Sequence, residues 1–346
     1  MRGLRKYLTP FAPDQSGAVS VLYELGGIIV ICDAGGCTGN VCGFDEPRWF
    51  ERKSAVFSAG LRDMDAILGR DDRLVAKLVD AADKIDANFA AIVGTPVPAV
   101  IGTDYQALKR MCEKKTDLPI LAIDTDGMEL YDKGEEKAYL ALFTAFAKEK
   151  YEVCKEKVGI LGMTPQDVSD LKAAGKVREE LKKEGKEAIC YGMGDGLEAV
   201  ERASEVGKNI VVSAAALEVA KYLEKTFGTP YEIGYPAAGE LVPNLDYQGK
   251  EILVVHQQVM AEAIRQEILK RENSAEVQTA TWFMRKKELA CPQDVSLREE
   301  DDYIDLVKNG GFDIIFADAC MEKMVPDFQG IFVKTRHFAV SGRLCE

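Results

Sequence analysis

The stretch "GGIIVICDAGGCTGNVCGFDEPRW", residues 26–49, joins an apolar run to a glycine-rich loop. The run "GGIIVIC" is typical of a buried strand, because it is short, continuous and bounded by glycine. Cys32, Cys37 and Cys42 follow at intervals of five residues. In α/β proteins, ligands bind at the carboxyl ends of strands, where such a loop would lie. The stretch therefore raises the question of whether the thiols bind a metal, act as a catalyst or simply pack.

Strand and helix patterns alternate along the rest of the chain. The segment "LVAKLVDAADKI" (74–85) has apolar residues three and four apart, which predicts a helix, and "FAAIVGTP" (89–96) predicts the next strand. The alternation restarts at "KVGILGMTPQD" (157–167) and again at "KEILVVHQ" (250–257). Strand–helix alternation favours parallel sheets with helices on both faces. The sequence therefore predicts an α/β fold of three Rossmann-like units, with parallel sheets flanked by helices.

Two segments mark the predicted boundaries between these units. "KEKYEVCKEK" is a charged helix exit, and "PNLDYQGK" is polar and rich in turn-forming residues. We expect a first unit at residues 1–150, which carries the cysteine loop, a second at 151–247 and a third at 248–330. The tail, 331–346, is too short for a domain and is expected to pack back on an earlier unit.

The composition narrows the classes of partner. The net charge is −13, which repels nucleic acid phosphates, so no nucleic acid partner is expected. The longest apolar stretch, around residues 18–35, is interrupted by Glu24 and several glycines and predicts no membrane span. No apolar segment of the secretory kind follows the basic start, so we expect a cytoplasmic protein. An odd number of cysteines, nine, then favours metal binding or redox chemistry over disulfides.

Other common sites are not indicated. The only histidines are His256 and His337, which argues against a histidine-rich metal site and a cysteine–histidine hydrolase. The segment "GMGDG" (192–196) lacks the spacing of a dinucleotide-binding fingerprint, and its glycines are interpreted as turn residues. The sequence contains no P-loop motif.

Three interpretations of the cysteine loop compete: packing, a thiol nucleophile and iron–sulfur ligation. Buried cysteine is a common small hydrophobic residue. A nucleophile needs a lowered pKa and usually a base, and histidine is scarce. Thiolates are preferred ligands of iron, and the backbone at Gly35, Gly36 and Gly39 could wrap a cluster and donate N–H groups to its sulfides. Iron–sulfur ligation by Cys37, Cys42 and Cys32 is therefore the favoured hypothesis.

Three cysteines are one fewer than the usual four ligands of a cluster. Either a distant residue completes the set, or two copies of the chain share one cluster across a two-fold axis. The second alternative predicts a homodimer with the cluster at its interface.

Several segments together resemble nitrogenase component 1 and its relatives. They are "PFAPDQSGAVSVLYELGGIIVICDAGGCTGN" (10–40), "IVGTPVPAVIGTDYQAL" (92–108), "ERASEVGKNIVVSAAALEVAKYLEKTFGTPYEIGYPAA" (201–238) and "FAVSGRL" (338–344). In that family, a cysteine after glycine ligates a bridging iron–sulfur cluster, and Cys37 stands at the matching position. Cys42 and Cys32 lie near it and could substitute for the family's other ligands.

The resemblance implies an iron–sulfur electron-transfer oxidoreductase. Its relatives accept low-potential electrons from a separate ATP-hydrolysing reductase, the Fe protein, and pass them through a [4Fe-4S] or larger fused cluster to a substrate. Such proteins are oxygen-sensitive, so anaerobic handling is implied. Other relatives only serve as scaffolds for cofactor assembly. A cofactor-assembly scaffold and a tetrapyrrole or small-ligand binding protein remain alternatives, and the short chain is closest in size to the homodimeric nickel-tetrapyrrole branch.

The chain also departs from the family pattern. Phe11-Ala12-Pro13 stands where the family has its first ligand cysteine, and Pro96 stands where it has the third. The cysteine that holds the molybdenum–iron cofactor of true nitrogenases has no counterpart around Ser213 to Ala216, while His337 stays open as the second ligand of that cofactor. Dinitrogen reduction is therefore not expected.

A few further residues are candidates for function. Asp33 lies within the loop and is a weak catalytic candidate, either as a proton acceptor or as a turn-stabilising residue. Cys320 follows a predicted strand at a place where ligands gather. Arg48 and Trp49 follow the loop and either lie near a reductase docking surface or anchor the loop.

Overall fold

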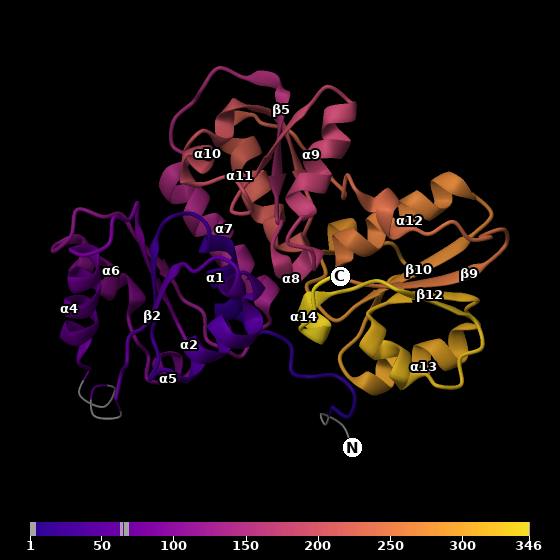
Figure 1. Ribbon diagram of the computed structural model, residues 1–346, viewed down its shortest axis with the longest axis horizontal. Helices are drawn as coiled ribbons and strands as arrows, with labels where there is room; N and C mark the ends of the chain where they lie inside the picture. The colour runs from indigo at the N-terminus through magenta and orange to yellow at the C-terminus, as the bar shows by residue number, and fades with distance from the viewer. Residues whose placement is uncertain (1–4, 63–64, 66–68, 346) are drawn as a thin grey trace.

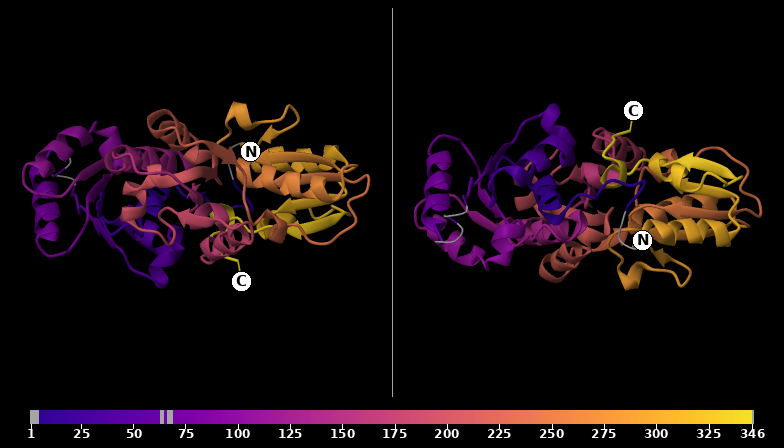
Figure 2. Two further views of the ribbon diagram at one scale, coloured as in Figure 1. Left: turned by 90° about the horizontal axis from the view of Figure 1, so that it is seen from above. Right: turned by 90° about the horizontal axis from the view of Figure 1, so that it is seen from below.

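The computed structural model describes residues 5–62, 65 and 69–345. It contains three parallel β-sheets, each flanked by helices, so the predicted α/β fold is confirmed. The three sheets belong to three lobes, which meet around the short helices α8 (Pro165–Val168) and α14 (Phe338–Ser341) (Figure 1). Seen from above and below, the second lobe lies between the first and the third (Figure 2).

The first sheet has the strand order β2-β1-β3-β4. Its first strand, β1 (Ile28–Ile31), is the apolar run of the opening stretch, and all four residues are buried. Buried on both faces, this strand needs no alternation of polar residues. The other strands, and the helices that cover the two faces, are β2 (Ala55–Ser58), β3 (Ala90–Val93), β4 (Ile120–Ile123), α1 (Asp14–Leu22), α4 (Asp71–Ala82), α6 (Tyr105–Glu113) and α7 (Tyr131–Phe146).

The two faces of the first sheet belong to two hydrophobic clusters. Ile28 and Val30 pack with Leu74 of α4 in what we call the outer cluster. Ile29 and Ile31 belong to the central cluster, together with residues of α1, α7 and, from the second lobe, α11 (Leu217–Phe227). Successive strand residues point to opposite faces, which explains this division. Helix α7 thus contributes to the cores of two lobes.

The second sheet has the order β6-β5-β7-β8. Its elements are β5 (Cys154–Leu161), β6 (Glu187–Cys190), β7 (Val206–Val211), β8 (Tyr231–Ile233), α9 (Ala173–Lys183), α10 (Leu197–Glu201) and α11 (Leu217–Phe227). The third sheet has the order β11-β10-β9-β12-β13. Its elements are β9 (Glu251–Val255), β10 (Glu276–Thr281), β11 (Val295–Ser296), β12 (Ile314–Ala317), β13 (Ile331–Lys334), α12 (Gln258–Arg271) and α13 (Glu300–Gly310). A further buried cluster joins the cores of the second and third lobes.

The C-terminal tail divides its contacts between two lobes. Strand β13 pairs in parallel with β12 and so extends the third sheet. The backbone N–H of Cys345 donates to the carbonyl of Ser169, just after α8, at 2.7 Å. The sheets fix where the strands lie, but the residue boundaries of the units stay predictions.

Helices α1 and α7 approach each other very closely. A Cβ atom on Gly17 would lie 1.9 Å from the carbonyl oxygen of Tyr131, and one on Gly134 would lie 1.7 Å from that of Asp14. Only glycine fits at either position. This contact fixes α1, which leads into β1 and the cysteine loop, against the centre of the molecule.

Candidate metal centre at the cysteine loop

The cysteine loop after β1 is mostly helical, and Glu46 is extended between its last two helical segments. It starts as α2 (Gly36–Asn40), continues as a π-helical turn (Val41–Asp45) and ends in a 3₁₀ turn (Pro47–Phe50). Gly35 precedes α2 with a φ of 122°, a conformation that residues with a Cβ rarely adopt. A Cβ on Gly36 or Gly39 would meet no atom within 4 Å. A side chain would fit at either position, so the packing of the chain does not require glycine there. Because both residues are glycine, the outer side of the loop is left open.

Cys37 and Cys42 lie on the same side of the first sheet. Cys42 is 9% exposed and belongs to the central cluster, and Cys37 is half-buried and packs against the same cluster. The hydroxyl of Thr95, which lies near Cys37, donates to the backbone carbonyl of Cys32 at 2.6 Å. The structure thus holds two thiols of one loop at the border between core and solvent.

Cys32 lies elsewhere. It is fully buried in the outer cluster, beside Leu74 and Cys112. The reason is strand alternation: Ile31 points into the central cluster, so the next residue points to the opposite face. Within the described part of the chain, no group of three or more histidine, cysteine or acidic side chains is placed to hold a metal ion. The predicted set of Cys37, Cys42 and Cys32 is therefore not brought together in one chain.

Asp33 stabilises the start of α2. Its carboxylate accepts hydrogen bonds from the backbone N–H and the hydroxyl of Thr38, at 2.8 and 2.9 Å, and from the hydroxyl of Ser58 at 2.6 Å. A carboxylate engaged in this way matches the turn-stabilising interpretation.

The thiols are poor free nucleophiles. Burial, followed by the charge of Asp33, raises the pKa of Cys37. Burial, followed by the charges of Glu46 and Asp33, raises the pKa of Cys42. Burial also raises the pKa of Cys32. A metal ion that displaces the protons would overcome this effect, because ligation requires thiolates.

Arg48 anchors the loop from below. Its buried guanidinium pairs with Glu46 at 2.7 Å and Glu24 at 3.2 Å, and donates to the carbonyls of Ser20 and Gly192 at 2.7 and 3.1 Å. It also lies 4.7 Å from the ring of Tyr23. These contacts tie the loop to α1 and to a turn of the second lobe, so the geometry favours the anchoring role over surface docking.

Trp49 and the glycine turn support the same anchor. Trp49 packs against the central cluster. Gly192 has a φ of 74°, and a Cβ there would lie 2.9 Å from the carbonyl of Val21. The interpretation of "GMGDG" as a turn is consistent with this positive φ and with the φ of 106° at Gly194.

The two positions that replace family cysteines are apolar in the structure as well. Pro96 begins α5 (Pro96–Val100) directly after Thr95 and lies beside Gly127. Phe11 packs against Trp282 and Phe283 of the third lobe, with ring centroids 5.9 and 5.0 Å apart. Neither position offers a metal ligand.

Exposed apolar side chains occur on the elements around the loop. Phe44 and Phe50 of the loop itself are 73% and 76% exposed, Val97 and Val100 of α5 are 61% and 78% exposed, and Met128, after β4, is 70% exposed. We call these five residues the loop rim. Apolar residues on neighbouring elements of this kind are typical of an interaction surface.

A second cluster of polar groups lies where the three lobes meet. The hydroxyl of Tyr131 donates to Asp167 at 2.7 Å and lies 3.3 Å from Nε2 of His337, whose ring stacks on that of His256 at 4.0 Å. Glu135 accepts a hydrogen bond from Thr164 at 2.6 Å and is hydrogen-bonded to Asp167. We call Tyr131, Glu135, Asp167, His256 and His337 the junction; each is at most 3% exposed.

Burial sets the protonation of the junction. It raises the pKa of Asp167 to about 6 and that of Glu135 well above its usual value. Two buried carboxylates can hydrogen-bond each other only if one carries a proton, which the raised pKa assigns to Glu135. Burial also lowers the pKa of His256 to about 4 and that of His337 well below its usual value, so both imidazoles are neutral at pH 7.

The sequence did not indicate this cluster. The two histidines are eighty-one positions apart, and their separation argued only against a histidine-rich site. One signal was available, because His256 directly follows β9 and Thr164 and Asp167 follow β5. The carboxyl ends of strands from different lobes converge there. Asp318 likewise follows β12 and accepts the backbone N–H of His337 at 2.9 Å. Cys320 is half-buried beside Asp318 in a 3₁₀ turn and stays an untested candidate.

The protein is thus a three-lobed α/β protein, and the loop after its first strand carries two free thiols, Cys37 and Cys42, on one side of the sheet. Comparison with known proteins gives the family. A family model described as nitrogenase component 1 type oxidoreductase matches residues 15–237, and the chain belongs to this family. The match includes the cysteine loop, α1 from its second residue, α7 and the second sheet.

Curated relatives include two nitrogenase iron-molybdenum cofactor biosynthesis proteins NifE. That of Clostridium pasteurianum is 26% identical over 181 residues, which are 51% of this chain and 38% of the relative. That of Bradyrhizobium diazoefficiens is 23% identical over 188 residues, which are 51% of this chain and 32% of the relative. The match therefore spans about a third of the length of these relatives.

Solved structures share the fold. A structure of nitrogenase Cp1 at pH 6.5 superposes with a TM-score of 0.71 and 13% identity, covering 96% of this chain and 87% of the other. A structure of nitrogenase Cp1 at pH 5 gives a TM-score of 0.68, with coverage of 96% and 84%. Within the described residues, no helix is both long and apolar enough to span a bilayer.

Proposed function

We propose that the protein is an iron–sulfur electron-transfer oxidoreductase of the nitrogenase component 1 type. It accepts low-potential electrons from an ATP-hydrolysing, Fe-protein-like reductase and delivers them to a substrate other than dinitrogen. The observation that carries the proposal is the pair Cys37 and Cys42, held at the border of the core in a turn whose glycines face open space. Membership of the family supports the same conclusion.

The residues present fit a cluster shared by two chains. Each chain supplies two thiols on one side of its sheet, and two chains supply the four thiolates that a [4Fe-4S] cluster takes. A cluster of this kind stores and releases one electron at a time at low potential. Gly36 and Gly39 leave space on the outer side of the turn, where side chains would otherwise block an approaching group. A larger fused cluster would need further ligands from either chain.

The loop rim supports a homodimer. Phe44, Phe50, Val97, Val100 and Met128 expose apolar surface on the elements that surround the two thiols. Burying such surface is the main driving force of association. A two-fold axis through this face would bring the two cysteine loops together and complete the ligand set.

The chain's own residues prepare the site in two ways. Asp33 fixes the start of α2 and so the position of Cys37. Arg48 ties the end of the loop to α1 and the second lobe, so that the two thiols sit on a rigid support. Rigid positioning lowers the reorganisation that accompanies each change of charge in a metal site.

A cofactor-assembly scaffold is the second candidate. The curated relatives are cofactor biosynthesis proteins, which favours this role for the same thiol loop. The two functions differ in turnover. An oxidoreductase catalyses steady-state substrate reduction with a reductase and ATP, whereas a scaffold transfers its cluster once to a recipient protein.

Anaerobic purification with iron and sulfide analysis tests the metal site. We expect about four iron atoms per dimer, as a [4Fe-4S] cluster requires, and a cluster EPR signal after reduction. Cys37→Ser and Cys42→Ser should each lose most of the iron, while Cys154→Ser, which changes a half-buried thiol on β5, should keep it. Iron-free protein from anaerobic cells, or full iron in both loop variants, would refute the assignment.

A further inference from the structure

Strand β4 is the outermost strand of the first sheet, and no described strand pairs with its outer edge. The N–H groups of Ala90 and Gly94 in and after β3 donate to the carbonyls of Pro119 and Ile123 at 2.9 and 3.0 Å. In a parallel pair, alternate residues direct their backbone groups toward the neighbouring strand. Ile120 and Ala122 therefore direct their N–H and C=O groups away from β3.

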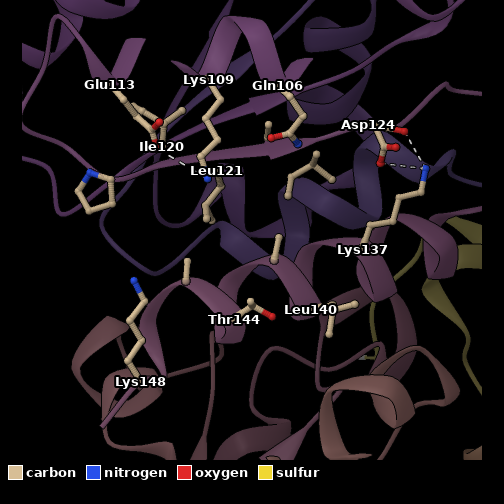
Figure 3. A pocket seen from close by; sticks show the side chains of 15 residues that line it. Gln106, Lys109, Glu113, Ile120, Leu121, Asp124, Lys137, Leu140, Thr144 and Lys148 are labelled. Carbon is tan, nitrogen blue, oxygen red and sulfur yellow. Dashed lines mark hydrogen bonds and ion pairs between the residues drawn. The ribbon is translucent and has the colours of Figure 1, made fainter. Parts of the chain in front are cut away.

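A groove of about 570 Å³ runs along this edge. Residues 119–124 form its floor, and helices α6 and α7 form its two walls (Figure 3). We call it the β4 groove. The wall residues recur at helical spacing and face the groove: Gln106, Lys109 and Glu113 on α6, and Lys137, Leu140 and Thr144 on α7, followed by Lys148 just after the end of α7.

The third sheet shows what an occupied edge of this kind looks like. There β12 pairs with β9 on one side and with β13 on the other, from Ile314 with Ile331 to Ala317 with Lys334. Strand β13 follows β12 after a short 3₁₀ turn rather than after a long helix. Strand β13 thus extends the third sheet beyond β12, and no described strand does so beside β4.

We propose that the β4 groove binds an extended acidic segment of a partner protein, which pairs with β4 as an added fifth strand. In this mode of recognition, main-chain hydrogen bonds supply affinity and alternate side chains supply specificity. The free backbone groups of Ile120 and Ala122 provide the main-chain partners. Leu140, which is 40% exposed on the α7 wall, provides apolar contact.

The charges of the groove favour an acidic occupant. On a chain with a net charge of −13, three lysines line the groove against two carboxylates. Lys137 contacts Asp124 at 3.4 Å, and Lys109 contacts Glu113 at 3.7 Å. Lys148 makes no ion pair with the described residues, so it remains available to a carboxylate of the occupant.

The same charges argue against a second copy of the chain as the occupant. Two β4 edges paired across a two-fold axis would bring the lysine-lined walls of both copies together. Like charges that face each other across an interface oppose association.

The test uses anaerobically purified full-length protein and a ten-residue peptide of alternating glutamate and valine. We expect the peptide to slow amide hydrogen exchange over residues 119–124, measured by mass spectrometry. A peptide of alternating lysine and valine should leave the exchange unchanged. The readout does not involve iron, so the outcome is separate from that of the metal assignment.

Three variants and one control variant locate the binding. Lys109→Glu and Lys148→Glu should each weaken binding of the acidic peptide by about tenfold, as reversal of a charge at an interface does. Ala122→Pro removes an edge donor while the pairing of β4 with β3 is kept, and should abolish the protection. Lys225→Glu, on the exposed end of α11, should bind as the unchanged protein does.

Three results would overturn the proposal. The first is equal binding of both peptides, and the second is no protection of residues 119–124 from hydrogen exchange by the acidic peptide. The third is protection of these amides that increases with protein concentration without any peptide and disappears in Ala122→Pro. The last would assign the edge to a second copy of the chain.

Discussion

The cysteine loop and the junction are both built at the carboxyl ends of parallel strands, yet they differ in what completes them. In the junction, side chains from three lobes satisfy one another, and each of the five residues is at most 3% exposed. In the loop, Arg48 and Asp33 are held by hydrogen bonds, Cys37 is half-buried against the central cluster, and a Cβ on Gly36 or Gly39 would meet no atom within 4 Å. The junction joins the parts of one chain. The loop, in our proposal, is completed by a cluster and a second chain.

The largest expected effect comes from removing Arg48, whose ion pairs support the cysteine loop. Arg48→Ala leaves Glu46 buried without its cationic partner, and breaking a buried ion pair costs about 3–5 kcal/mol. Urea unfolding measures the loss. The matched control is Arg52→Ala, because Arg52 also pairs with Glu24, at 3.0 Å, but its side chain is 71% exposed. The control should cost no more than about 1 kcal/mol. Equal losses would contradict the anchoring role of Arg48.

The next effect concerns the junction and acid. His256 accepts the N–H of Gln257 at Nδ1, at 2.9 Å, so protonation at that atom breaks a hydrogen bond. Its pKa falls from an unfolded value of about 6.5 to about 4, so stability is complete above pH 6.5 and is lost as the pH falls to 4. The loss from this group is about 3 kcal/mol at pH 4.

The variant His256→Gln isolates this contribution. Relative to the unchanged protein, its free energy of unfolding should increase as the pH falls from 6.5 to 4, because the variant has no group at this position to protonate. Thermal or urea unfolding over that pH range gives the difference. A difference that does not change with pH would mean that His256 is not buried as a neutral group.

The shared proton of the junction predicts the opposite pH dependence. The raised pKa of Glu135 favours folding while the group is protonated, and this advantage is lost as the pH rises from about 4.5. Glu135→Gln keeps an acceptor for Thr164 and a donor for Asp167 but cannot ionise. Its stability relative to the unchanged protein should therefore rise by about 1.4 kcal/mol per pH unit until Glu135 is ionised in the folded state. Parallel unfolding curves at pH 5, 7 and 9 would contradict the shared proton.

The smallest expected effect concerns the glycines of the cysteine loop and tests whether the loop, unlike the junction, holds a cluster. Gly39→Ala should stabilise the iron-free chain by about 0.5–1 kcal/mol, because alanine is the better helix former and the added Cβ meets nothing. The same change should lower the iron content if a cluster occupies the outer side of the turn. Gly35→Ala is the control, since a φ of 122° makes it destabilising in either state. Unchanged iron content in Gly39→Ala would place the cluster elsewhere.

Much of the fold could be predicted because the central strands are buried on both faces and their helices are amphipathic. Helix α1 gave no such periodic signal, since all nine of its residues are buried. Strands β2 and β13 were missed because they are short, exposed in part and next to polar loops. An edge strand depends on its partner strand more than on its own sequence.

The site was predictable only in part. The spacing of the cysteines indicated a thiol loop, but whether two of them share a face depends on the π-helical turn at Val41–Asp45, which no residue pattern predicts. The position of Cys32 followed from strand alternation with Ile31, which the hypothesis of three ligands overlooked. The junction depends on how three lobes meet, so sequence separation said nothing about its histidines.

Helix α7 has a practical consequence for dissecting the molecule. One side of it presses on α1 through Gly17 and Gly134, and its apolar residues, such as Tyr139 and Leu142, share a core with the second lobe. A fragment cut near residue 150 would keep the cysteine loop but would leave the far flank of α7 uncovered. We expect such a fragment to aggregate, so a soluble minimal version of the loop has to retain the second lobe or carry polar replacements along α7.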